Sequence, residues 1–118
     1  MQDVVQAPWS ITADKVQHVV HRLVEVAQPR KIVLFGSYVQ GQSHPDSDLD
    51  VLVVAPDSVT SPRREAVRLR RALRGIGICL DILVVRESDF NRLQDQIGLI
   101  YREAVQQGRT VFDADPAA

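Results

Sequence analysis

The chain has 118 residues, a formal net charge of −1 and a single cysteine, and 45% of its residues are hydrophobic while 25% are charged. This length suits one compact domain with no room for a second substrate-binding domain, and the apolar content excludes a disordered chain. One cysteine excludes an intrachain disulfide, and we expect Cys79 to be a small core residue. The near-neutral charge gives no general argument for a nucleic-acid partner.

Neither a signal peptide nor an apolar run long enough to span a bilayer is visible in the sequence. We therefore expect a cytoplasmic protein without membrane contact.

The first half of the chain predicts one helix and two strands. Residues 11–28 place apolar side chains at helical spacing. Lys31–Phe35 is a short apolar run that Gly36-Ser37 ends, which is typical of a buried strand followed by a tight turn. A polar loop over residues 42–47 leads to a second apolar run, Leu49–Val54. The linker between these strands suits either a parallel or an antiparallel pair.

The second half predicts two helices, two strands and a tail. These are a helix from Pro62 to near Gly75, a strand over Ile78–Val85, a turn capped by Ser88, a helix over Gln94–Gln107, an edge strand over Arg109–Phe112 and a loose tail from Asp113 to Ala118. Strands alternating with helices predict an α/β fold, in which helices flank a small mixed β-sheet. We expect a single domain over residues 1–118, with its core at about residues 31–85.

Two of the predicted core strands contain an aspartate within an apolar run, Asp50 and Asp81. A lone ionised carboxylate in a core is costly, so such groups need a cation, a hydrogen-bond cluster or a metal beside them. Asp48 lies two residues before Asp50, and in an extended chain both side chains point to the same face. If the strand of Asp81 lies beside theirs, the three carboxylates form an oxygen-rich site suited to Mg²⁺ or Mn²⁺ rather than zinc.

The Gly36-Ser37 pair suggests a phosphate site beside these carboxylates. Gly36 lets a ligand approach the backbone closely, and the following amides can form an anion-binding nest or the start of a short helix. The Ser37 hydroxyl can donate to a phosphate oxygen, and Ser47 either shapes the loop or adds a hydrogen bond to the site. Phosphates held beside a carboxylate-bound metal are what phosphoryl or nucleotidyl transfer requires.

The whole pattern is Gly36-Ser37, ten residues, then Asp48-Leu49-Asp50, with Asp81 in a later apolar strand. It resembles the signature of the DNA polymerase β-like nucleotidyltransferase superfamily. The small size resembles the minimal nucleotidyltransferase group, many members of which are antitoxins of HEPN-type ribonuclease toxins. The resemblance implies a polymerase β-like fold, in which Asp48 and Asp50 hold two Mg²⁺ ions and Asp81 shares one of them. It also implies that Asp81 helps to deprotonate the acceptor hydroxyl, while Gly36 and Ser37 hold the triphosphate.

The same resemblance implies that the chain transfers AMP from ATP to a hydroxyl of a partner protein, a HEPN-type toxin. Two alternatives stay open: a binding module that neutralises a toxin by docking alone, and a transferase that acts on RNA ends. The six arginines of the stretch Arg63–Arg74 either form a solvated helix face or contact ATP phosphates, an acidic partner surface or RNA. The sequence leaves the nucleotide, the acceptor and the oligomeric state open.

Overall fold

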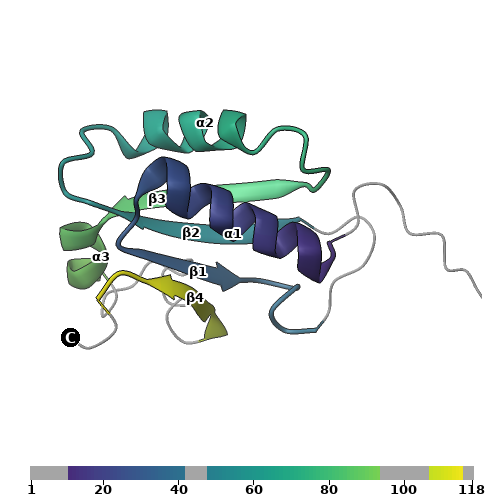
Figure 1. The fold of residues 1–118 in the computed structure, drawn as a ribbon. Helices are drawn as coiled ribbons and strands as arrows, with labels where there is room; N and C mark the ends of the chain where they lie inside the picture. Colours follow the sequence, from purple (N-terminus) through teal and green to yellow (C-terminus); the bar gives the residue numbers. More distant parts are fainter. Residues whose placement is uncertain (1–10, 42–47, 94–106, 116–118) are drawn as a thin grey trace, which may run out of the picture.

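A computed structural model describes residues 11–41, 48–93 and 107–115 of the chain, which form three helices and one four-stranded sheet (Figure 1). In chain order the elements are α1 (Ala13–Ala27), β1 (Lys31–Phe35), β2 (Leu49–Ala55), α2 (Pro62–Ala72), β3 (Leu80–Arg86), α3 (Glu87–Leu93) and β4 (Arg109–Asp113). The predicted α/β class is confirmed, and so is the small mixed sheet flanked by helices. None of the described helices has the length and apolar content needed to span a bilayer.

The strands lie in the order β3-β2-β1-β4, and their pairing decides which neighbours are parallel, a question that the sequence left open. β1 pairs antiparallel with both β2 and β4, whereas β2 and β3 are parallel. A parallel pair needs a crossover connection, and α2 supplies it. The starts of β2 and β3 therefore lie at one end of the sheet, next to the end of β1.

The apolar pattern of α1 explains why this helix covers the sheet. Thr12 caps it by accepting a hydrogen bond from the Lys15 N–H at 3.2 Å, and its buried side chains are Val16, Val19 and Leu23. These side chains lie one helical turn apart, so they share one face. Gln28 ends the helix in a left-handed conformation.

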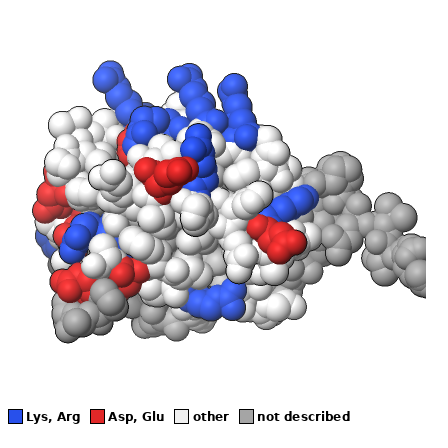
Figure 2. Space-filling view, in the orientation of Figure 1, with Lys and Arg blue, Asp and Glu red and all other residues white. Residues whose placement is uncertain are grey.

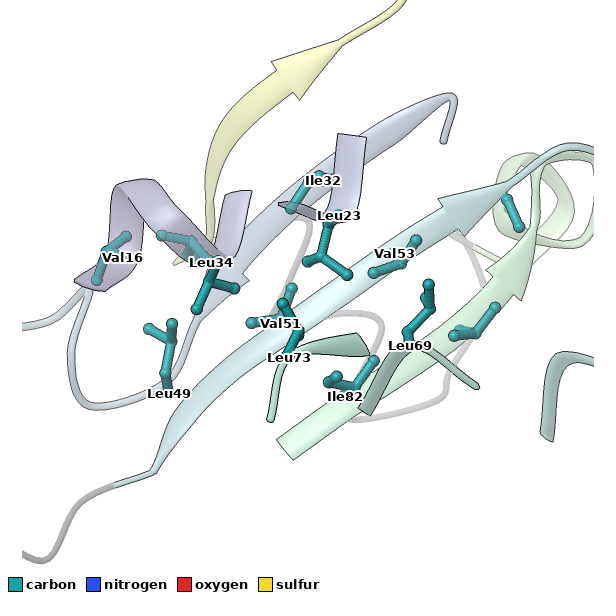
Figure 3. Close-up of a cluster of buried hydrophobic side chains, with 13 residues drawn as sticks. Val16, Leu23, Ile32, Leu34, Leu49, Val51, Val53, Leu69, Leu73 and Ile82 are labelled. Atoms are coloured by element: carbon teal, nitrogen blue, oxygen red, sulfur yellow. The ribbon is translucent and has the colours of Figure 1, made fainter. Parts of the chain in front are cut away.

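Two apolar clusters lie on opposite faces of the sheet. The larger one fills the space between the sheet and the helices α1 and α2, where Leu23, Val51 and Leu69 meet (Figure 3). The smaller one lies on the other face, where Phe90 of α3 packs with apolar side chains from three strands. Those side chains are Val33, Phe35, Leu52, Val54 and Val85. Alternate residues of β2 thus serve both clusters, which explains why this strand is apolar almost throughout.

The third strand begins at Leu80, two residues later than predicted. Gly75 and Gly77 before it have positive φ angles of 91° and 81°, so the connection from α2 turns sharply here. Cys79 is exposed, which contradicts the expected core position. It precedes the strand, and only its carbonyl joins the sheet, accepting the Leu49 N–H at 2.9 Å.

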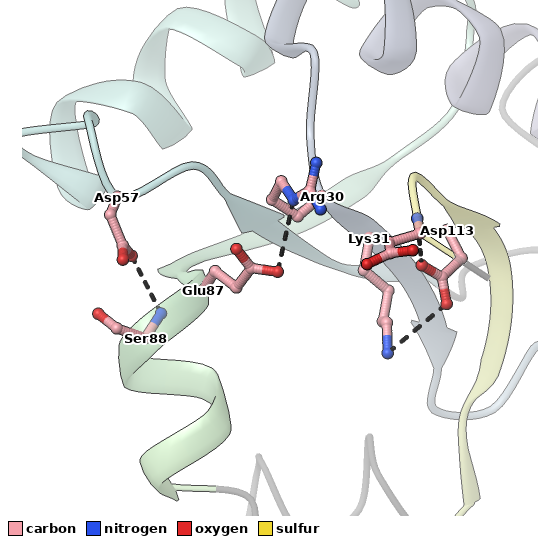
Figure 4. Close-up of polar contacts among 7 residues, drawn as sticks. Arg30, Lys31, Asp57, Glu87, Ser88 and Asp113 are labelled. Carbon is pink, nitrogen blue, oxygen red and sulfur yellow. Dashed lines mark hydrogen bonds and ion pairs between the residues drawn. The ribbon is translucent and has the colours of Figure 1, made fainter. Parts of the chain in front are cut away.

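The helix α3 was not predicted, since the sequence indicated only a turn capped by Ser88 at this place, whereas a helix follows β3 directly. Ser88 is the second residue of this helix and therefore not its cap. Its N–H donates to Oδ1 of Asp57 at 3.0 Å (Figure 4). The carboxylate of Asp89 accepts hydrogen bonds from Arg92 and Arg86, which lower its pKa. The predicted helix over residues 94–107 lies almost wholly outside the described residues.

The predicted edge strand is confirmed and is one residue longer than expected. Asp113 belongs to β4 and not to a loose tail, because it pairs with Lys31 in the sheet and its carboxylate lies 3.8 Å from the Lys31 ammonium (Figure 4). The Ala114 N–H donates to the Arg30 carbonyl at 2.9 Å. Arg30 also reaches Glu87 of α3 at 3.4 Å, so polar contacts join three elements at this end of the sheet.

Candidate active site

Two of the three predicted site aspartates lie side by side on neighbouring strands. In the register of the sheet, Asp50 of β2 pairs with Phe35 of β1 on one side and with Asp81 of β3 on the other. Adjacent strands lie about 4.8 Å apart, so the two carboxylates leave the sheet close together. The end of β1 leads directly into Gly36, which brings the predicted phosphate turn to the same place.

The carboxylates lie on the sheet face opposite α1 and α2. Side chains two residues apart on a strand share a face, and Asp50 is followed at that interval by Leu52, which belongs to the smaller cluster. Asp81 likewise shares a face with Val85, which lies four residues later and also belongs to the smaller cluster. The two long helices therefore cover one face, and the carboxylates line the other at the starts of β2 and β3.

The expectation that these aspartates are buried in the core is wrong. Asp81 is exposed and Asp50 is only half-buried, although both follow the apolar strand pattern. Each lies near the start of its strand, on the face that carries only the smaller cluster. The cost of burying a lone charge therefore gives no argument for a bound cation at these positions.

The predicted convergence of three carboxylates is not found in the described part of the chain. No group of three or more His, Cys, Asp or Glu side chains there is arranged to hold a metal ion. Asp48 is exposed and precedes β2, so no ladder hydrogen bond holds it in register with Asp50 and Asp81. The donor chemistry still fits a hard cation, because Asp50 and Asp81 present carboxylate oxygens from adjacent strands.

Gly36 is in close contact with Asp50. Its φ of 80° lies in the left-handed region, and a Cβ atom at this position would overlap Oδ2 of Asp50 and lie 3.0 Å from its Cγ. A side chain here would therefore displace the carboxylate. The predicted proximity of the glycine turn to the carboxylates is thus observed for Gly36 and Asp50.

Ser37 begins a single hydrogen-bonded turn that runs to Gly41. The Gln40 N–H donates to the Gly36 carbonyl at 3.2 Å, and the Gly41 N–H donates to the Tyr38 carbonyl at the same distance. Ser37 is half-buried and follows Gly36 directly in the chain. Ser47, the third predicted nucleotide-binding residue, lies outside the described residues.

Two contacts that the sequence did not predict link this turn to β4 and to Gln107, which precedes that strand. The Arg109 guanidinium lies 5.9 Å from the centre of the Tyr38 ring, a cation–π distance, and Gln40 Nε2 donates to Gln107 Oε1 at 2.7 Å. These pairs are about 70 residues apart in the chain, a separation similar to that of the residues which pair β1 with β4. No local signal could have identified them, since they depend on β4 pairing with β1.

The exposure of Asp81 predicts that its replacement will hardly affect stability. We expect Asp81→Asn to change the free energy of unfolding by less than about 0.5 kcal/mol, as is usual for surface substitutions. Urea denaturation will measure it. Leu52→Ala is the control, because Leu52 is fully buried on the same face and should lose about 2–5 kcal/mol. A loss on Asp81→Asn comparable to that of the control would show a structural carboxylate.

Solved structures share this arrangement of helices and strands. One is a "putative nucleotidyltransferase" from Sulfolobus solfataricus, with a TM-score of 0.59 and 16% identity over 86% of this chain and 80% of that one. Another is a toxin–antitoxin with AMP-PNP, with a TM-score of 0.54 and 22% identity over 90% of this chain and 77% of that one. A third is a mutant form of the toxin–antitoxin MntA-HpeT, with a TM-score of 0.56 and 22% identity over 85% of this chain and 74% of that one. At these identities the likeness shows the fold.

The sequence itself matches a family. A comparison with individual curated proteins found no match, whereas a comparison with models of protein families did. The family model described as "Polymerase beta, Nucleotidyltransferase" matches residues 17–117, nearly the whole chain. This match includes Gly36, Asp48, Asp50 and Asp81, and the fold agrees with it. The chain therefore belongs to the polymerase β nucleotidyltransferase family and has its fold.

Proposed function

We propose that this chain transfers AMP from ATP to a hydroxyl of a partner protein, and that the partner is a HEPN-type toxin which the transfer inactivates. The observation that carries the proposal is the contact of Gly36 with Asp50, which lies beside Asp81 in the sheet. It places a glycine turn, where phosphates can approach the backbone, against carboxylates from two strands. Family membership supports nucleotidyl transfer, and fold neighbours that are toxin–antitoxin proteins, one with AMP-PNP, support the nucleotide and the partner.

In this proposal Asp48, Asp50 and Asp81 hold Mg²⁺, with Mn²⁺ as a substitute. When bound, the ion neutralises phosphate charge and stabilises the leaving pyrophosphate. The triphosphate is bound by Gly36, Ser37 and Ser47. Gly36 has no side chain, so phosphates can approach its backbone closely, and the serines donate hydrogen bonds from their hydroxyl groups. Such a reaction draws on ATP, so we place it in the cytoplasm.

Asp81 accepts the proton of the attacking group. The acceptor oxygen forms a bond to the α-phosphorus, the bond from that phosphorus to the pyrophosphate oxygen breaks, and the hydroxyl proton passes to the Asp81 carboxylate. The exposure of Asp81 suits this role, because an acceptor presented by a second protein must reach it from outside. Asp48 and Asp50 face the phosphates instead.

Mass spectrometry of a co-expressed HEPN-type toxin tests the proposal. With wild type and ATP, we expect the toxin to gain the mass of AMP and to lose ribonuclease activity. With Asp48→Asn, we expect no adduct and an active toxin. If Asp48→Asn still neutralises the toxin and no adduct forms with wild type, the chain acts as a binding module by docking alone.

A further inference from the structure

The outer face of α2 carries a cluster of arginines around one apolar side chain. Val67 is 45% exposed, and among the described residues no other large hydrophobic side chain is exposed. On a helix the surface neighbours of a residue lie three and four positions away. For Val67 all four of these positions are arginines, namely Arg63, Arg64, Arg70 and Arg71. We call these five residues the α2 face.

The positive charge of the α2 face is not neutralised within the described residues. Glu65 is the one acidic residue of α2, and its carboxylate forms an ion pair with Arg68 at 2.7 Å. The four arginines around Val67 form no ion pair with any of the described residues. Figure 2 shows the blue side chains gathered over α2 and projecting from the molecule. The chain as a whole has a net charge of −1, so this positive charge is strongly localised.

The face is hollowed as well as charged. A groove of about 540 Å³ is lined by Val67 together with Arg63, Arg64, Arg68 and Arg71. The aliphatic stems of arginine form apolar walls while their guanidinium groups stay in solvent. A ligand that fits this groove offers both an apolar group for its floor and anionic groups for its rim.

We propose that the α2 face is a docking surface for an acidic segment of a partner protein, one that inserts an apolar side chain beside Val67 and places carboxylates against the surrounding arginines. Arginine suits this role because its planar guanidinium can bind a carboxylate through two parallel hydrogen bonds. A nucleic-acid backbone would use the arginines but leave the exposed valine without an apolar partner. The net negative charge of the rest of the chain also favours a locally acidic segment over a long polyanion.

Docking at this face leaves the candidate active site accessible. Leu69 of α2 and Leu73, which caps the end of this helix, belong to the larger cluster, whereas Asp50 and Asp81 lie on the opposite face of the sheet. A partner held at α2 therefore does not cover the carboxylates. The inference does not depend on nucleotidyl transfer, so its test can fail or succeed independently of the proposed function.

Fluorescence anisotropy with a model peptide tests this surface. The probe is a labelled helical peptide of about 18 residues, long enough to populate a helix, with a row of leucines flanked by glutamates. We expect it to bind wild type, and the same peptide with every glutamate replaced by glutamine to bind at least about tenfold more weakly, since opposite charges across the interface are then lost. Titration with oligouridine tests the nucleic-acid alternative.

Matched variants locate the binding site. We expect Arg64→Glu to weaken peptide binding at least about tenfold and Val67→Ser to weaken it about threefold, because one reverses a rim charge and the other removes the apolar floor. Arg64 lies in the first turn of α2, where an acidic residue suits the helix dipole, so the variant should fold. Arg92→Glu on α3 makes the same charge change elsewhere and should bind as wild type does.

Three results would overturn the proposal: no binding of the acidic peptide, equal weakening by Arg64→Glu and Arg92→Glu, or an unchanged affinity in Val67→Ser. Tighter binding of oligouridine than of the peptide, lost with Arg64→Glu but not with Val67→Ser, would assign the face to nucleic acid.

Discussion

Replacing Asp81 with asparagine is expected to leave most ATP binding intact and to lower the rate of AMP transfer by a factor of about 10²–10⁴, the usual contribution of a general base. Asparagine keeps the shape of the side chain but cannot accept the proton of the attacking hydroxyl. Because Asp81 is exposed, the folded structure should not change with it. Single-turnover transfer of labelled AMP will measure the rate, and calorimetry with Mg²⁺ will measure ATP affinity.

Asp48→Asn is the comparison for this experiment, because Asp48 is also exposed and its loss should weaken Mg²⁺-dependent ATP binding itself. Loss of transfer with retained binding in Asp81→Asn, and loss of both in Asp48→Asn, would separate the chemical step from nucleotide binding. Undiminished transfer by Asp81→Asn would remove Asp81 from the mechanism. Equal ATP affinity with and without metal in the wild type would contradict the proposed role of all three carboxylates.

Gly36→Ala is expected to reduce transfer by at least about 10²-fold, because small displacements of a catalytic geometry have effects of this size. The new Cβ would overlap Oδ2 of Asp50, so the carboxylate must move away from the glycine turn. The positive φ adds a conformational cost of about 1–2 kcal/mol for an L side chain. Transfer assays and urea denaturation will measure the two effects.

Gly41→Ala is the matched control within the same turn. Gly41 has a φ of 73°, close to that of Gly36, but a Cβ there meets nothing within 4 Å. Both variants place an L side chain at a positive φ and should lose similar conformational stability, but only Gly36→Ala displaces Asp50. If the two variants lose transfer equally, the contact between Gly36 and Asp50 is not what matters for activity.

The sequence by itself determined most of the helices and strands of the described residues, although not α3, and it indicated a chemistry for the candidate site. α1 and β1 were predictable because their apolar spacing and their flanking glycine and proline residues are local signals. The Gly36-Ser37 and Asp48-Leu49-Asp50 pattern was sufficient to indicate the family, since the types of residue and their spacing do not depend on how the strands pack. The roles of these residues remain predictions.

The tertiary structure alone decided where these residues lie. Strand pairing placed Asp81 beside Asp50, and the packing of α1 and α2 on one face left both carboxylates on the other. The apolar sequence around each aspartate had instead predicted a position in the core. The contact of Arg109 with Tyr38 likewise depends on β4 joining β1. The physical reason is that periodicity reports which side chains share a face, whereas the exposure of a face depends on which distant elements cover it.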